Sequence, residues 1–294
     1  MDGYQPSPPP SGEPGPRLSG PPPLAAPKRR PAGPITRFRA ALQLQSTVIS
    51  AIMLREIHTR FGRHNLGYLW LFFEPMILAF CIASVHKLSG HGMPGGIDPM
   101  AFYIVGYTPY YLFRSILNRA ASALQANAPL FYHRQVTFLD VLIARNLLDT
   151  AAVMVALMVM LLGLGAVTGD WPDDLVWMAI GVMLMAAFCH GVALMIVAAT
   201  AWGVENVERV VHPLTYLMIP LTGAFIAVWW FPTELQEIAL LNPTIHMFEM
   251  IREAQFGPVV PHHYSLSYAV CSVAIVNAVG LVALRAGRRH IELI

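Results

Sequence analysis

Two charged residues, Glu74 and Arg114, lie within apolar stretches that are long enough to cross a bilayer. A charge at membrane depth costs roughly 2.5–3.5 kcal/mol on insertion scales, so such residues usually face a protein interior or a wet path. Glu74 lies about 10 Å into its stretch, and Arg114 about 20 Å into the next, at 1.5 Å per residue. Neighbouring spans run antiparallel, so these two depths are counted from opposite surfaces of the membrane. In a core of ~30 Å the two residues therefore lie at the same level. We expect these side chains to form an ion pair or to line a pore together.

The composition is that of an integral membrane protein. The chain is 55% hydrophobic and only 12% charged, with a mean hydropathy of +0.53, and it contains several apolar runs of about 20 residues. The sequence therefore predicts an all-α, polytopic membrane protein with six transmembrane helices. The expected spans are roughly 67–88, 101–122, 141–166, 175–200, 211–231 and 265–286.

Basic residues set the expected orientation. An even number of spans places both ends of the chain on one side of the membrane. With the N-terminus inside, most arginines fall in cytosolic segments, whereas Lys87 and Arg252 fall outside. This bias predicts that both termini are cytosolic.

The N-terminal part of the chain divides into two expected regions. Residues 1–34 hold 12 of the 24 prolines and no apolar run, which predicts a disordered cytosolic tail followed by a transmembrane domain over 35–294. Apolar residues recur at helical spacing over 35–60, so we expect an amphipathic interface helix that lies in the inner leaflet. A simple membrane anchor is the alternative reading of that helix.

Two further segments are too polar for a span. Residues 127–140 are expected to form a short cytosolic helix that presses on a soluble partner. Residues 242–257 begin with Asn-Pro and end with glycine, a pattern that predicts a short helix. We expect re-entrant helices here, between spans five and six, since backbone at membrane depth must be buried by protein. An ordinary surface loop containing a helix is the alternative.

Several kinds of chemistry find no support in the sequence. A P-loop requires GxxxxGK[ST], and the only lysines are Lys28, in the expected tail, and Lys87. The chain alone is therefore not expected to hydrolyse ATP. The three cysteines, Cys81, Cys189 and Cys271, fall in expected spans without metal-ligand spacing, and the histidines form no tight ligand set. We expect no metal, no cofactor in this chain and no catalysis.

Four segments carry a resemblance to a known family: RFGRHNLGYLWLFFEP (60–75), HRQV (133–136), HPLTYLMIPLTGAF (212–225) and NPTIHMFEMIREAQFG (242–257). The chain is similar to the membrane subunit of polysaccharide-exporting ABC transporters of the type-2 exporter fold, and the capsule branch fits best. The resemblance covers about residues 35–290, while the proline-rich tail departs from the shorter N-termini of that family and leaves its role open.

This resemblance implies a set of partners in the bacterial inner membrane. It implies a homodimer that works with two copies of a separate ABC ATPase, which binds ATP and Mg. The implied substrate is a lipid-linked capsular polysaccharide. A periplasmic polysaccharide co-polymerase and an outer-membrane export protein would act next, and no nucleic acid is involved.

The resemblance also gives roles to three groups of residues. Aromatic faces suit sugar rings, and Pro75 kinks its helix, either where a lipid-linked substrate enters or simply for packing. The expected substrate conduit comprises Trp70, Phe73, Glu74, Tyr103, Tyr107, Tyr110 and Arg114. The residues expected to bind lipid headgroups or the ATPase are Arg55, Glu56, Arg60, Arg63, His133 and Arg134. The re-entrant motif comprises Asn242, Pro243, Glu249 and Arg252.

Other functions remain open at this level. The same fold could export O-antigen, teichoic acid, or a small molecule or drug. A membrane-embedded glycan-processing enzyme and a non-transporting scaffold are the alternatives from other classes. A neighbouring gene for an ATPase without its own spans would favour transport.

Overall fold

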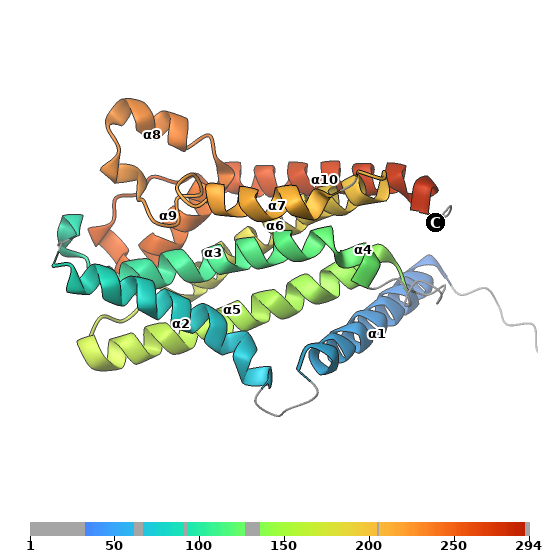
Figure 1. Cartoon of the computed structure of the whole chain (residues 1–294), viewed down its shortest axis with the longest axis horizontal. Coiled ribbons are helices and arrows are strands. Elements are labelled where there is room, and N and C mark those ends of the chain that lie inside the picture. The colour runs from blue at the N-terminus through green and yellow to red at the C-terminus, as the bar shows by residue number, and fades with distance from the viewer. Residues whose placement is uncertain (1–32, 62–66, 91–92, 127–135, 205, 292–294) are drawn as a thin grey trace, which may run out of the picture. The chain divides into compact units, whose positions relative to one another are not determined.

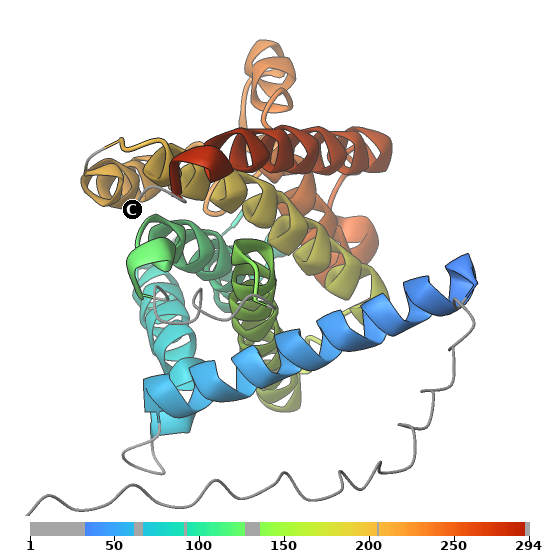
Figure 2. The ribbon, with the colours of Figure 1, turned by 90° about the vertical axis from the view of Figure 1, so that its right-hand side faces the viewer.

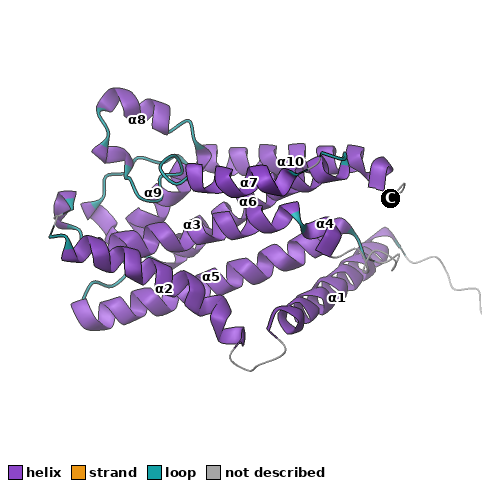
Figure 3. Cartoon of the chain, viewed as in Figure 1, coloured by secondary structure: helices purple, strands orange, loops and turns teal. Residues whose placement is uncertain are grey.

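The computed structural model describes residues 33–61, 67–90, 93–126, 136–204 and 206–291. These parts of the chain consist of helices joined by loops and turns, without strands (Figure 3). The chain divides into two compact units, Met1–Ala41 and Leu42–Ile294. Within the described residues, the first unit contributes only the start of helix α1, Pro34–Phe61. The helix expected over 35–60 is therefore present, whereas the expected disordered tail lies almost entirely outside the described residues.

The second unit contains the remaining helices (Figure 1). Three of the described helices are long and apolar enough to cross a membrane, over Phe138–Thr168, Leu175–Ala201 and Leu266–Gly287. Two further helices, α2 and α3, lie where the sequence predicts the first two spans. The long helices are α2 Gly67–Leu88, α3 Pro99–Ala121, α5 Phe138–Thr168, α6 Leu175–Ala201 and α10 Leu266–Ile291, and the four-residue α4 is Ala123–Ala126.

The expectation of one continuous helix over 211–231 is wrong. Helix α7 covers Val207–Leu217, turns follow, and the chain then forms the 3-10 helix η3 Val228–Trp230. Pro220 has no amide hydrogen to continue the helical ladder. Gly223 adopts a φ of 85°, which is unfavourable for other residues. Together they replace the second half of the expected helix by an irregular segment.

Helix α3 forms the centre of the second unit. Every residue from Ala101 to Phe113 is buried, and the helix packs against α2, α5, α6, α7 and α9. Leu112 and Ile116 continue into the main apolar core. Because one face of α3 is held in this core, its polar face is fixed in position between α2 and α7.

Small residues allow α6 and α10 to pack closely. A Cβ atom on Gly280 would lie 2.7 Å from the carbonyl oxygen of Gly191, so only glycine fits at this crossing. Such close approach is typical of helix pairs in membranes. Asn277 on α10 adds a hydrogen bond from Nδ2 to the Ala187 carbonyl oxygen at 2.8 Å.

The segment between α7 and α10 folds into short helices. After η3 come α8 Thr233–Ala239, α9 Pro243–Phe256 and the 3-10 helix η4 Gly257–Val259. Asn242 caps α9, because its Oδ1 accepts a hydrogen bond from the Thr244 amide at 3.0 Å. Pro243 occupies the first turn and Gly257 the C-cap, as the sequence pattern predicts. Re-entry of these helices into the membrane stays a prediction.

The cytosolic helix expected over 127–140 is described only in part. Residues 127–135 lie outside the described residues, and α5 begins at Phe138. Thr137 caps α5 through a capping box with Asp140. Within the second unit, residues 42–61 of α1 run crosswise to α5 (Figure 2).

Candidate functional site

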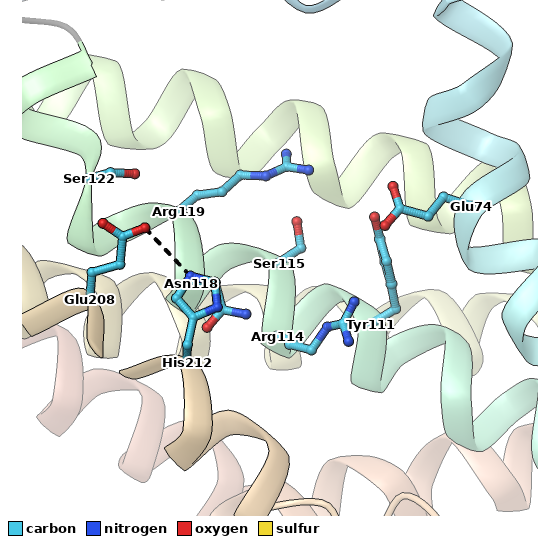
Figure 4. A pocket seen from close by; sticks show the side chains of 9 residues that line it. All are labelled: Glu74, Tyr111, Arg114, Ser115, Asn118, Arg119, Ser122, Glu208 and His212. Atoms are coloured by element: carbon cyan, nitrogen blue, oxygen red, sulfur yellow. Dashed lines mark ion pairs between the residues drawn. The ribbon is translucent and has the colours of Figure 1, made fainter. Parts of the chain in front are cut away.

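A polar cavity of about 290 Å³ lies between α2, α3 and α7 (Figure 4). The sequence-predicted charges Glu74 and Arg114 both line it, although they belong to different helices. The full lining is Glu74, Tyr111, Arg114, Ser115, Asn118, Arg119, Ser122, Glu208 and His212.

Helix α3 supplies most of this lining because of the spacing of its polar residues. Tyr111, Ser115, Asn118 and Ser122 follow one another at intervals of three or four, so they share one face of the helix. The opposite face carries Phe113, Ile116 and other buried apolar residues. The core therefore orients the polar face towards the cavity.

Aromatic rings hold the guanidinium of Arg114. Its Cζ lies 5.2 Å from the centre of the Tyr216 ring and 5.7 Å from that of Tyr111, within range of a cation–π contact. Its Nη1 also donates a hydrogen bond to the Tyr216 hydroxyl at 2.9 Å. Figure 4 shows the Glu74 carboxyl beside Tyr111. Glu74 and Arg114 thus line one cavity, and no ion pair joins them in the described residues. That the two charges line a pore stays a prediction.

A second arginine in the wall, Arg119, is fixed by a buried aspartate. The Nη1 atom of Arg119 lies 2.5 Å from Oδ1 of Asp149 on α5, and Asp149 is only 3% exposed. Ser115 donates to the other carboxylate oxygen at 3.3 Å. Charge-assisted contacts of this kind are among the stronger hydrogen bonds, so Arg119 is held at a defined place in the wall.

Helix α7 forms the remaining wall. Glu208 and His212 lie one turn apart, with Oε1 and Nε2 separated by 3.7 Å. Thr215 donates a hydrogen bond to Asn118 at 3.2 Å, and the Tyr110 hydroxyl donates to the carbonyl oxygen of Thr215. These bonds join α7 to α3 beside the cavity.

The lining combines both signs of charge with neutral donors and acceptors. Arginine side chains recognise anionic oxygens, often through two parallel hydrogen bonds. The serines, Asn118 and the carboxylates can exchange hydrogen bonds with hydroxyl groups. Among the residues that the structure describes, no group of three or more His, Cys, Asp or Glu side chains could hold a metal ion. The cavity therefore suits a polar ligand that carries hydroxyl and anionic groups.

The predicted tyrosine stripe lies beside the cavity and does not line it. Tyr103, Tyr107 and Tyr110 are buried, and their rings lie 6.0, 6.2 and 6.2 Å from that of Phe225. The spacing thus places them on one face, which packs on the segment after α7. Contact between these tyrosines and a substrate stays a prediction.

The two aromatic residues predicted on α2 contribute less to the described site. Phe73 is 46% exposed and points away from the core. Trp70 belongs to α2, but its side chain lies outside the described residues. Their part in a conduit also stays a prediction.

Some of the residues predicted to bind lipid headgroups or the ATPase lie outside the described residues. Arg55 is exposed, and Glu56 lies with Oε1 at 3.3 Å from Nε of Arg145 on α5. Arg60 is part of α1, with its side chain outside the described residues. Also outside the described residues are Arg63, His133 and Arg134.

The motif on α9 contains a fully buried ion pair. Arg252 Nη1 lies 2.8 Å from Oε1 of Glu249, and Nη2 donates to the carbonyl oxygens of Gly223 and Ala224. The amide of Val228 donates to Glu249 at 3.1 Å. Burial raises the pKa of Glu249, and the nearby guanidinium opposes that shift. The pair thus joins α9 to the irregular segment that follows α7.

Sequence reasoning missed the ion pairs that support the cavity. Arg119, Arg145 and Asp149 were not singled out, although all three fall within the expected spans 101–122 and 141–166. The cost of charge at membrane depth, which identified Glu74, applies also to Asp149, whereas Arg119 and Arg145 lie near the cytosolic ends of their expected spans, where this cost is smaller. Glu208 and His212 carried no such signal, because they lie at the edge of the expected fifth span.

Long apolar helices, three of which could cross a membrane, define a polytopic membrane protein, and a polar cavity lies between its helices α2, α3 and α7. Comparison with known proteins gives the particular family. The chain belongs to the ABC-2 type transporter family, whose model matches residues 47–256.

Similar proteins cover nearly the whole chain. It is 34% identical over 263 residues to the capsule polysaccharide export inner-membrane protein BexB of Haemophilus influenzae, covering 88% of this chain and 98% of that protein. It is 34% identical over 260 residues to the capsule polysaccharide export inner-membrane protein CtrC of Neisseria meningitidis serogroup B, covering 87% and 97%. The polysialic acid transport protein KpsM of Escherichia coli is 28% identical over 258 residues, covering 84% and 96%. The chain is thus a transporter membrane subunit and not an enzyme.

Proposed function

We propose that this chain is the permease subunit of an ABC transporter that exports lipid-linked capsular polysaccharide across the bacterial inner membrane. The observation that carries the proposal is similarity over most of the chain to proteins named for capsule polysaccharide export. The polar cavity supports it, because a transported glycan presents the hydroxyl and anionic groups that the lining suits.

The proposed topology has six crossings of the membrane. They are made by α2, α3, α5, α6, α10 and, as one crossing, α7 with the irregular segment after it. Both termini then lie in the cytosol, which agrees with the distribution of basic residues in the sequence. Helices α8 and α9 re-enter from the outer side in this arrangement.

Energy for transport comes from a separate ATPase in this proposal. Two copies of that subunit bind ATP and Mg. This chain has no P-loop of its own, because Lys28 and Lys87 are its only lysines and neither belongs to such a motif. Two copies of the permease form a homodimer, and the polymer moves along their seam. Exposed apolar residues on α2 and α7, such as Ile77 and Val210, face the second copy or lipid.

The polar cavity contacts the polymer or its lipid-linked end in this mechanism. Arg114 and Arg119 bind anionic groups, and Asn118 and the serines bind hydroxyl groups. A periplasmic co-polymerase and an outer-membrane export protein receive the polymer beyond the membrane.

Deletion of the gene, followed by location of the polymer, tests this function. Finished capsule chains should accumulate in the cytosol, and a plasmid copy of the wild-type gene should return them to the cell surface. Fractionation and an antibody against the polymer measure both. Normal surface capsule in the deletion strain would overturn the proposal, and retention of O-antigen or teichoic acid instead would replace the substrate.

A further inference from the structure

Helix α1 is attached to the start of α5 by both polar and apolar contacts. Glu56 and Arg145 form an ion pair at 3.3 Å, with side chains only 12% and 10% exposed. Gln45 donates a hydrogen bond to Asp140 at 3.1 Å. Ile52, which is 4% exposed, packs in a small core with residues at the start of α5. Residues 42–61 of α1 therefore cannot move far without the N-terminal end of α5.

The same part of α5 reaches the polar cavity. Arg145 and Asp149 lie four residues apart in one continuous helix, so they share a face. Asp149 in turn holds Arg119 at 2.5 Å and Ser115 at 3.3 Å, and both of these residues line the cavity. Two ion pairs on one turn of α5 thus connect α1 to the cavity wall on α3.

We propose that Glu56, Arg145, Asp149 and Arg119 form a coupling ladder that transmits the nucleotide state of the ATPase from α1 to the polar cavity. The inference rests on the proposed function, in that an ATPase must act on the cytosolic side of this chain. Within the ladder, Glu56 and Arg145 are positioning residues, because they act on the cavity through Asp149 and Arg119.

The physical basis of the ladder is the cost of separating buried charges. Breaking a buried ion pair is strongly unfavourable, because each charge then lies in a poorly solvated interior. Both ion pairs therefore stay intact when α1 is displaced, and α5 and α3 move together with α1. Apolar contacts alone, such as those of Ile52, allow helices to slide past one another more easily because they have no fixed geometry.

A labelling experiment on the assembled transporter tests this transmission. Cys81, Cys189 and Cys271 are replaced by alanine, and Ser122→Cys places one thiol in the cavity wall. The permease and its ATPase partner are reconstituted in nanodiscs. The rate of labelling by a thiol reagent is measured without nucleotide and with ATP trapped by vanadate, and ATP hydrolysis is measured in parallel.

The informative variant is Glu56→Met with Arg145→Met. It removes both members of the pair together, and apolar replacement of a whole buried pair is often tolerated. Arg145→Lys, which keeps the charge, is the conservative variant. Lys87→Gln is the matched control, because it breaks the ion pair between Lys87 and Asp98, which has no part in the ladder.

We expect nucleotide to change the labelling rate in the parent protein and in the Lys87→Gln control. In the double methionine variant this change should fall by at least about fivefold, the lower end of measured coupling between sites, while ATP hydrolysis continues. The single variant Arg145→Lys, which keeps Glu56 and the positive charge, should retain part of the nucleotide response. A purely stabilising pair would alter thermal stability without altering the nucleotide response.

Three results would overturn the coupling ladder. They are a full response in the double methionine variant, no response in the parent protein, or loss of the ATPase from the variant complex, which would make the pair a docking contact. Capsule export is measured separately in cells. A normal nucleotide response in a protein whose deletion leaves capsule unaffected would discard the proposed substrate and leave the coupling ladder in place.

Discussion

The polar cavity and the α9 motif both contain arginines and carboxylates within an apolar protein, yet they use them differently. At α9, Arg252 is 0% exposed and its bonds go to Glu249 and to two backbone carbonyl groups. At the cavity, Arg114 and Arg119 keep part of their surface exposed and border an open volume of about 290 Å³.

The difference separates a structural charge from a charge that can meet a ligand. Both kinds incur the cost of leaving water, and both have polar or oppositely charged groups beside them. A ligand can approach only where the charge also borders a cavity. Burial of a charge in a span is therefore not enough to assign it a role in transport.

The largest expected effect is loss of the buried pair at α9. Arg252→Met should destabilise the protein by about 3–5 kcal/mol, because Glu249 loses its charged partner in a buried site. Thermal unfolding of the purified protein, followed by fluorescence, measures this. Glu249→Met added to Arg252→Met should recover only part of the stability, since the amide of Val228 would lose its acceptor. A stable single variant would remove the distinction between the two regions.

A smaller loss is expected at the supported wall of the cavity. Arg119→Gln removes the charged donor to Asp149, and a hydrogen bond to a charged group contributes about 1.5–3 kcal/mol. We expect lower thermal stability together with reduced capsule export. Arg119→Lys, as the matched control, should retain more of both. Unchanged export despite lower stability would make Arg119 structural, like Arg252.

Substitutions at Glu74 and Arg114 should affect transport more than stability. Reversal of either charge should reduce export at unchanged protein abundance, because these side chains border the cavity. The combined swap, Glu74→Arg with Arg114→Glu, should be no better than the single reversals, since the two residues are not paired in the described structure. Capsule quantification at the cell surface measures export, and recovery by the swap would show that the two residues pair during transport.

The smallest effect on stability is expected at the α7 wall. Glu208 and His212 form an exposed pair one turn apart, and such helix pairs contribute about 0.3–0.5 kcal/mol. Glu208→Gln should therefore leave the melting temperature nearly unchanged. A shift as large as that of Arg119→Gln would place Glu208 among the structural charges.

Much of the helical arrangement follows from local sequence. The apolar runs place α2, α5, α6 and α10 to within a few residues, and Asn242, Pro243 and Gly257 mark the ends of α9. Hydrophobic periodicity and capping are local properties, so one sequence is sufficient to read them. The break after α7 was not predicted, because the span 211–231 was inferred from the length of the apolar run alone.

The sequence by itself determined that this chain is a multi-helix membrane protein without its own ATP-binding motif, because composition and motif spacing depend only on the order of residues. The tertiary structure decided which charges pair across helices, as Arg119 does with Asp149 and Glu56 with Arg145. It also decided that the tyrosine stripe packs on Phe225 while Glu74 and Arg114 border a cavity. Helical spacing sets which residues share a face, but the neighbour that covers that face is set by packing between segments far apart in the chain.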